Sequence, residues 1–145
     1  MRKITTLITS VLVLSVGMNL NAQKKYSNKT INNLKNQAAE LVEDDKKMTQ
    51  VMIDKVFSFG ELGFQEFETS KYLSKILEEN GFDIEHQISG IPTSWLASWS
   101  NGEGGPVIAL GSDFDGVPST SQYPGVAYEK PVVDGAPGHG EGHNI

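Results

Sequence analysis

The apolar residues that follow position 27 recur at intervals of three and four, the spacing of one face of an α-helix. They are Ile31, Leu34, Ala38, Leu41, Val42, Met48, Met52 and Val56. The pattern predicts a core helix with one buried face. Ser27 or Asn28 is suited to cap its first turn, because a short polar side chain can accept a free backbone N–H there. The charged residues between Glu43 and Lys47 are predicted to lie on the solvated face.

A second helical pattern begins at about Glu66. Its apolar side is formed by Phe67, Leu73, Ile76 and Leu77. Asn80-Gly81 is expected to end this helix, because glycine readily takes the left-handed conformation that follows a last helical turn, and Phe82 is placed to pack back. Residues 57–64 contain two glycines and three phenylalanines, and this composition is typical of a packed connection between the helices.

Glu61, Glu66 and Glu68 are acidic residues that could serve catalysis. Nothing in the sequence pairs them with a base or a metal site. Solvent exposure or helix capping is therefore the preferred interpretation of all three.

Three strand-like segments follow, at residues 82–88, 95–99 and 106–110. The Gly-rich run at 101–105 is a turn signal, so the second and third segments are predicted to form a hairpin. The third segment, Pro106-Val-Ile-Ala-Leu110, has no polar alternation, which is typical of a strand covered on both faces. His86, alone in the first segment, is predicted to be a surface or packing residue.

Residues 1–22 have the features of a secretory signal peptide. Arg2 and Lys3 precede a mostly apolar run, and Ala22 provides a small residue for cleavage. The alternative is a membrane anchor, but the run is short and interrupted by threonine and serine. We therefore expect an exported protein, periplasmic or extracellular, whose mature part begins at residue 23.

The net charge and the absence of cysteine exclude some partners and one means of stabilising the fold. The chain has a net charge of −6, which argues against nucleic acid or an anionic membrane as the main partner. It contains no cysteine, so a disulfide framework is excluded. An exported fold must then rest on its apolar core or on a metal.

Two carboxylates, Asp113 and Asp115, come directly after the apolar segment 106–110. Open α/β sheets bind their ligands at the carboxyl ends of such strands. The alternative is a turn in which the aspartates bond to local amides.

The residues at the C-terminal end of the sequence carry the strongest chemical signal. His139, Glu141 and His143 alternate with glycine, and in an extended segment alternate side chains point to the same side. Imidazole and carboxylate together suit a borderline metal such as zinc. The alternative is a mobile Gly-rich tail that happens to contain histidine.

Together these stretches resemble the co-catalytic zinc amidohydrolases and carboxypeptidases of metallopeptidase family twenty. The resemblance runs from about residue 51 to residue 145, and it rests on residues 60–66, on 112–118 and above all on 135–144. It implies an α/β fold in which helices pack on a mixed sheet. Residues 23–145 would form the N-terminal portion of a zinc-peptidase-like catalytic domain, without the lid or dimerisation domain.

The resemblance also implies roles for individual residues. It assigns Asp115 to the catalytic site, where it steadies the metals from the strand end, and it makes Glu141 and His143 metal ligands. Asp113 and His139 would stand beside the ligands. The cofactor would be two divalent ions, zinc first, with manganese or cobalt as alternatives, because Glu141 replaces the cysteine of the amidohydrolase branch and makes the site harder.

The implied function is that of a secreted dinuclear metal-dependent amidohydrolase. Its substrate would be a small-molecule amide: an N-acyl amino acid, an aminobenzoyl-glutamate-like compound or a dipeptide. The general base and remaining ligands would lie beyond Ile145, so we expect a truncated catalytic domain that is inactive alone and a full-length homodimer. The alternative is an exported, non-catalytic metal-binding module.

Overall fold

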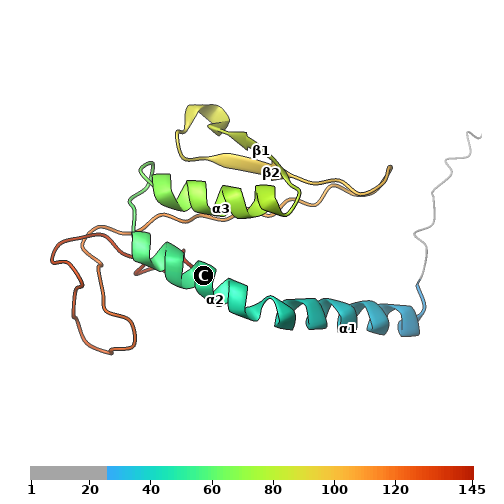
Figure 1. Cartoon of the computed structure of the whole chain (residues 1–145), viewed down its shortest axis with the longest axis horizontal. Helices are drawn as coiled ribbons and strands as arrows, with labels where there is room; N and C mark the ends of the chain where they lie inside the picture. Colours follow the sequence, from blue (N-terminus) through green and yellow to red (C-terminus); the bar gives the residue numbers. More distant parts are fainter. Residues whose placement is uncertain (1–25) are drawn as a thin grey trace, which may run out of the picture. The chain divides into compact units, whose positions relative to one another are not determined.

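The computed structural model describes residues 26–145, and the predicted signal peptide lies outside this range. The chain divides into two compact units between residues 39 and 40. Its elements are α1 (Asn28–Asp44), α2 (Lys46–Phe59), α3 (Phe67–Glu79), β1 (Asp83–His86), a 3₁₀ turn at Ile88–Gly90, and β2 (Trp95–Ser98). It is thus a mixed α/β chain (Figure 1).

Helix α1 begins where the sequence predicts. The Ser27 hydroxyl accepts the backbone N–H of Thr30 at 3.1 Å, which satisfies one of the free amides of the first turn. None of the residues of α1 is buried, however, so the prediction of a buried face is wrong for this stretch. The spacing of apolar residues determines which side chains share a face, but it does not determine that anything covers that face.

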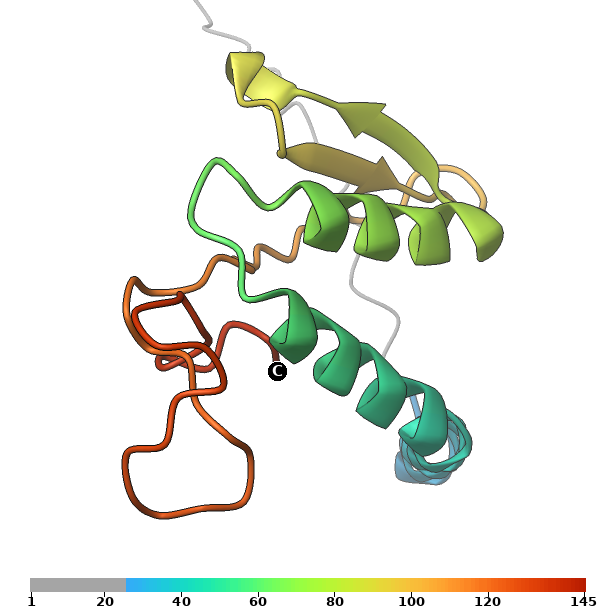
Figure 2. The same ribbon diagram turned by 60° about the vertical axis from the view of Figure 1, so that its left-hand side comes forward.

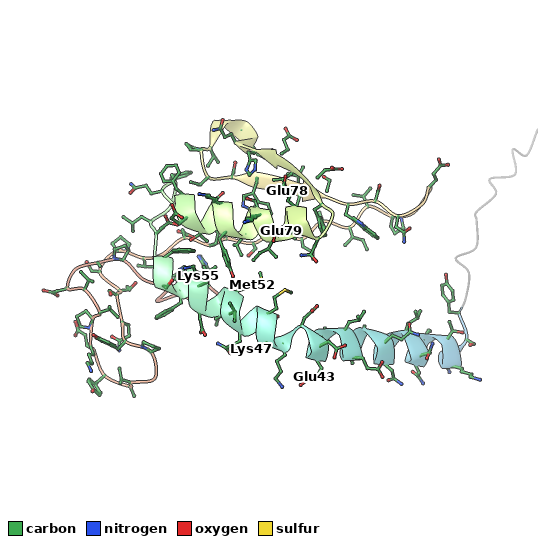
Figure 3. The ribbon with its side chains drawn as sticks, in the orientation of Figure 1. Glu43, Lys47, Met52, Lys55, Glu78 and Glu79 are labelled. Atoms are coloured by element: carbon green, nitrogen blue, oxygen red, sulfur yellow. The ribbon has the colours of Figure 1, made fainter. Side chains whose placement is uncertain are left out.

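The helical pattern predicted across residues 31–56 is divided at Asp45. This residue keeps right-handed helical angles, φ −82° and ψ −5°. Backbone bonds continue on both sides of it, from Asp45 N to Leu41 O at 3.1 Å and from Thr49 N to Asp45 O at 2.9 Å. In α2 the face is partly covered: Val56 is buried, and the half-buried Met52 lies on the side of α2 toward α3 (Figure 3).

Helix α3 has well-defined ends. Glu61 caps its first turn from outside the helix, since its carboxylate accepts the N–H groups of Glu68 at 3.0 Å and Thr69 at 2.9 Å. At the other end Gly81 is left-handed, at φ +86°. The N–H of Gly81 bonds to Glu78 O and that of Phe82 to Leu77 O, which is the paired pattern of a Schellman motif. The predicted end of this helix at Asn80-Gly81 and the capping interpretation of Glu61 are both confirmed.

The sheet differs from the prediction. Strand β1 pairs antiparallel with β2, in a register that runs from Asp83 opposite Ser98 to His86 opposite Trp95. The predicted hairpin between residues 95–99 and 106–110 is therefore wrong, and the described sheet is antiparallel rather than mixed. The turn at 87–94 closes the hairpin instead. Its ends are joined by Gln87 N to Ser94 O at 2.8 Å.

Residues 106–110 form no strand within the described chain, and their side chains are open to solvent. Val107 is 97% exposed and Leu110 96% exposed. The expectation of a strand covered on both faces is wrong, because a run of apolar residues acquires that environment only when other strands pair beside it. His86 is exposed, as predicted.

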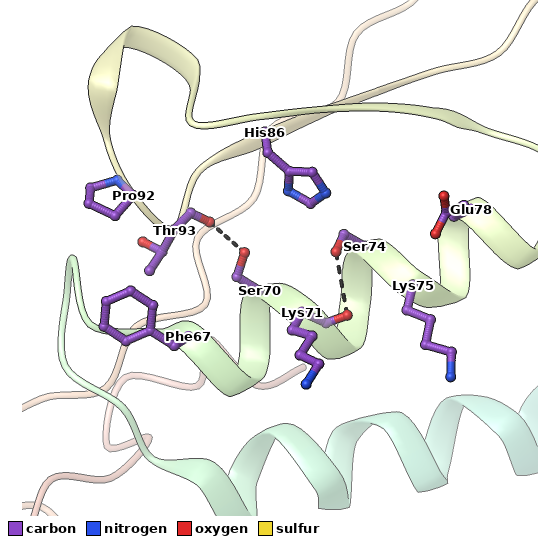
Figure 4. Close-up of a pocket in the computed structure, with 9 residues that line it drawn as sticks. All are labelled: Phe67, Ser70, Lys71, Ser74, Lys75, Glu78, His86, Pro92 and Thr93. Carbon is purple, nitrogen blue, oxygen red and sulfur yellow. Dashed lines mark hydrogen bonds between the residues drawn. The ribbon is translucent and has the colours of Figure 1, made fainter.

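Helix α3 lies between the β1–β2 hairpin and α2 (Figures 1 and 2). Its hairpin side carries small polar residues, among them the buried Ser70 and Ser74. The Ser70 hydroxyl donates to the Thr93 carbonyl at 2.7 Å. This contact lies in an open pocket of about 340 Å³ between α3 and the hairpin, where His86 also projects (Figure 4).

Glu66 is buried beside the same turn. Its carboxylate accepts the Thr93 hydroxyl at 2.6 Å. The preferred interpretation of this glutamate as exposed or capping is therefore wrong. Among the described helices, none has both the length and the apolar character needed to cross a membrane.

Candidate metal centre

Two short backbone pairings bring the segment that contains Asp113 and Asp115 to the His-Glu-His loop. Gly116 donates its N–H to Glu61 O. Val117 and Gly138 exchange two hydrogen bonds, of 2.8 and 3.1 Å. Segments that are far apart in sequence thus meet beside the end of α2, near which the C-terminal residues also lie (Figures 1 and 2).

This close approach requires glycine. A Cβ atom on Gly138 would lie 2.6 Å from the carbonyl oxygen of Thr120, and one on Gly116 would lie 3.0 Å from that of Gly138. Thr120 also stabilises the loop. Its hydroxyl can donate to either of two carbonyl oxygens, that of Val117 at 2.9 Å or that of Gly138 at 2.8 Å. The sequence contains no separate signal for this role of Thr120.

Asp115 and His143 are in direct contact. Oδ1 of Asp115 lies 2.9 Å from Nδ1 of His143, and both side chains are partly exposed. The carboxylate can only accept, so Nδ1 carries the proton in this bond and Nε2 is left free. A metal-binding histidine is commonly oriented by a carboxylate in this way.

Glu141 lies between the two histidines of the loop. Its Oε1 atom is 3.6 Å from Nδ1 of His143 and 3.7 Å from Nδ1 of His139. Asp115, Glu141, His143 and His139 therefore form one cluster, although only the Asp115–His143 pair is at hydrogen-bonding distance.

His139 is the most buried member of the cluster. Its Nε2 is 3.1 Å from the backbone carbonyl of Val56 in α2, and its ring lies 6.4 Å from that of Phe57. Its Nδ1 is buried and has no hydrogen-bond partner. The remaining predicted residue, Asp113, is exposed and acts on the cluster through its charge.

The acidic surroundings change the protonation of His143. The hydrogen bond to Asp115 is the main cause that raises the pKa of its imidazole above 6.5, and the negative charges of Asp115, Glu141 and Asp113 raise it further. Desolvation acts in the opposite direction and is outweighed. A proton and a metal ion would compete for this ring.

A cavity of about 200 Å³ lies beside Asp115. Asp113, Phe114 and Trp95 are among its walls. The rings of Trp95 and Phe114 are stacked, with centroids 6.1 Å apart. The Trp95 indole N–H is buried without a partner in the protein. The cavity thus places aromatic surface and two carboxylates side by side.

The donor set suits a divalent metal in its chemistry. Imidazole nitrogen and carboxylate oxygen are zinc ligands, and an unpartnered buried imidazole nitrogen is a group that a cation would satisfy. Within residues 26–145, however, no group of three or more such side chains is arranged to hold an ion as it stands. The described residues therefore offer pairs of donors rather than a closed coordination shell, and the ligand roles of Glu141 and His143 stay predictions.

The chain is related to the hydrolases of metallopeptidase family twenty, as its motifs predicted. It is similar to a p-aminobenzoyl-glutamate hydrolase subunit from Escherichia coli (strain K12), to which it is 34% identical over 106 residues. The aligned region is 73% of this chain and 22% of that relative, so the chain matches less than a quarter of the relative's length. No protein-family profile and no solved structure matches the chain.

Proposed function

We propose that this chain supplies part of the metal site of an amidohydrolase. The contact between Asp115 and His143, with Glu141 at 3.6 Å from the same ring nitrogen, is the observation that supports this function most directly. The relationship to a hydrolase subunit supports the reaction class. The zinc-peptidase-like fold of the whole catalytic domain is part of the same proposal.

Each residue has a distinct role in this proposal. Glu141 and His143 would hold the metal, and Asp115 would fix the orientation of the His143 ring through Nδ1 so that Nε2 can bind. Two divalent ions, zinc or alternatively manganese or cobalt, would supply Lewis-acid activation of the amide carbonyl and of water. Asp113 would add negative charge beside them.

The substrate we propose is a small amide of the N-acyl amino acid class. An aminobenzoyl-glutamate-like compound has an aromatic acyl group, and the cavity beside Asp115 has the stacked rings of Trp95 and Phe114 in its wall. The relative's name, which states hydrolysis of p-aminobenzoyl-glutamate, favours this choice over a dipeptide.

Export and assembly belong to the same proposal. The basic start and apolar run of residues 1–22 support secretion. The relative is named as a subunit of a hydrolase, which supports function within an oligomer. A homodimer is the form that the family resemblance favours.

A second function, a non-catalytic metal-binding module, is favoured by one observation. Glu141 stands where the amidohydrolase branch carries cysteine. Such a module would bind a metal and hydrolyse nothing.

Metal content and hydrolysis, measured together, test the proposal. The protein expressed from its complete reading frame would be compared with Glu141→Ala and His143→Ala for bound zinc and for release of p-aminobenzoate from p-aminobenzoyl-glutamate. We expect both signals in the unchanged protein and the loss of both in each variant. Metal binding without hydrolysis of any N-acyl amino acid would identify the module instead, and unchanged metal content in both variants would overturn the ligand roles.

A further inference from the structure

The two nitrogens of His139 have different environments. Nε2 lies 3.1 Å from the carbonyl oxygen of Val56, which can only accept a hydrogen bond. The proton of the neutral ring must therefore reside on Nε2. Nδ1 then carries a lone pair, and this atom is buried without a partner.

The carboxylate of Glu141 lies close to this unpartnered nitrogen. Oε1 of Glu141 is 3.7 Å from Nδ1 of His139. Both atoms are electron-pair donors, so they repel one another unless a positive charge stands between them. Since a buried polar atom is nearly always satisfied, the pair calls for a proton or a cation.

The separation of the two atoms favours a cation. A proton shared between imidazole and carboxylate would draw them to about 2.8 Å, and 3.7 Å is too long for that bond. Two ligand atoms on one tetrahedral zinc ion, each about 2.0–2.2 Å from the metal, are about 3.3–3.6 Å apart. Only a small movement would bring Nδ1 and Oε1 onto one ion.

We propose that His139 binds a metal ion directly through Nδ1, together with Oε1 of Glu141. The Val56 carbonyl at the end of α2 would then fix the tautomer of the ligand, as carbonyl groups behind metal-bound histidines commonly do. This inference rests on the proposed metal-binding function. It replaces the supporting role beside the ligands that the family resemblance implied for His139.

The two histidines of the loop would then use opposite nitrogens. His143 gives its Nδ1–H to Asp115 and keeps Nε2 for a metal, whereas His139 gives its Nε2–H to Val56 and keeps Nδ1. Glu141 lies between them. A metal ion bound by Glu141 and one of these histidines would keep further coordination positions for water or other ligands.

Nitrogen NMR of the histidine side chains tests this directly. The protein expressed from its complete reading frame, with ¹⁵N-labelled histidine, would be titrated with zinc. We expect the Nδ1 resonance of His139 to move on zinc addition while its Nε2 stays protonated. A shift that follows pH in the absence of zinc, and does not respond to the metal, would instead identify a protonated ring paired with Glu141 and overturn the inference.

The zinc affinity of two variants provides a second test of the inference. His139→Ala should weaken zinc binding at least about tenfold. Phe57→Leu changes the neighbouring ring but removes no donor, so it should bind zinc like the unchanged protein. If zinc binds with His139 Nδ1 unmoved and His139→Ala equally tight, this inference fails and the proposed function stands. If Glu141→Ala, His143→Ala and the unchanged protein all fail to bind zinc, the proposed function itself fails. The NMR readout on the unchanged protein does not depend on whether His139→Ala folds.

Discussion

Asp115 and His143 are 28 positions apart in sequence, and Oδ1 of Asp115 lies 2.9 Å from Nδ1 of His143, at hydrogen-bonding distance. The link is possible because Gly116 and Val117, directly after Asp115, pair with the backbones of Glu61 and Gly138. The segment around Asp115 and the Gly-rich loop are thereby held together. The geometry of the cluster depends on this backbone pairing as much as on the side chains.

Removing the negative charge of Asp115 should lower the pKa of His143. In the folded protein the hydrogen bond and charge of this carboxylate raise that pKa above 6.5. Asp115→Asn keeps the shape of the side chain but loses its charge, so the pKa should fall toward the ordinary value. A titration followed by histidine NMR measures this, with His86, which is distant in the β1 strand, as the internal control.

The same pair makes stability depend on pH in a defined direction. A histidine whose pKa is raised by folding binds its proton more tightly in the folded state. The pair therefore stabilises the fold fully below the unfolded pKa of about 6.5, and this contribution is lost as the pH rises through the raised value. The gap in melting temperature between the unchanged protein and Asp115→Asn should be larger at pH 5.5 than at pH 9. A gap that widens with increasing pH would contradict the assignment.

Gly138→Ala should disrupt the pairing between the segment around Val117 and the Gly-rich loop. The new Cβ would lie 2.6 Å from the Thr120 carbonyl oxygen and 2.9 Å from its carbon, so the backbone must move and the Val117–Gly138 bonds must weaken. Steric insertions of this kind cost about 1–3 kcal/mol. Thermal unfolding would show the loss.

Gly111→Ala is the matched control, because nothing lies within 4 Å of a Cβ at that position. It should melt like the unchanged protein. Equal melting temperatures for Gly138→Ala and Gly111→Ala would show that the close approach at Gly138 is absent in solution.

Glu61→Ala should destabilise α3. The Glu61 carboxylate accepts the N–H groups of Glu68 and Thr69 and the Thr69 hydroxyl, and its charge faces the positive end of the helix dipole. Losing a helix cap costs about 0.5–2 kcal/mol. Denaturant unfolding should show a loss in this range, whereas Glu85→Ala, at an exposed position of β1, should change stability by less than about 0.5 kcal/mol.

What could be predicted from the sequence is local. The Ser27 cap and the Asn80-Gly81 end of α3 are found where expected, because the groups that determine them lie within a few residues of one another. The family resemblance also implied that Asp115, Glu141 and His143 lie at one site, since a resemblance across separate stretches carries information about contacts between them.

What could not be predicted depends on pairing at a distance. Residues 106–110 have a buried-strand pattern, yet Val107 and Leu110 are exposed because no strand of the described chain lies beside them. The hairpin partner of β2 was misassigned because the turn at 87–94 carries a weaker glycine signal than 101–105. The contact of His139 with Val56 joins residues 83 positions apart and leaves no local pattern.

Zinc should stabilise the protein, and its removal should reverse the effect. A ligand that binds the folded state alone adds RT ln(1 + [L]/Kd), about 2.7 kcal/mol when zinc is present at 100 times its dissociation constant. Because a proton competes for the His143 ring, whose pKa is raised, the gain in melting temperature should be larger at pH 8 than at pH 6. Chelation should return the melting temperature to its starting value, and His143→Ala should show little gain at either pH. A zinc effect that is equal at both pH values would show that the ion binds elsewhere, at groups that do not exchange a proton in this range.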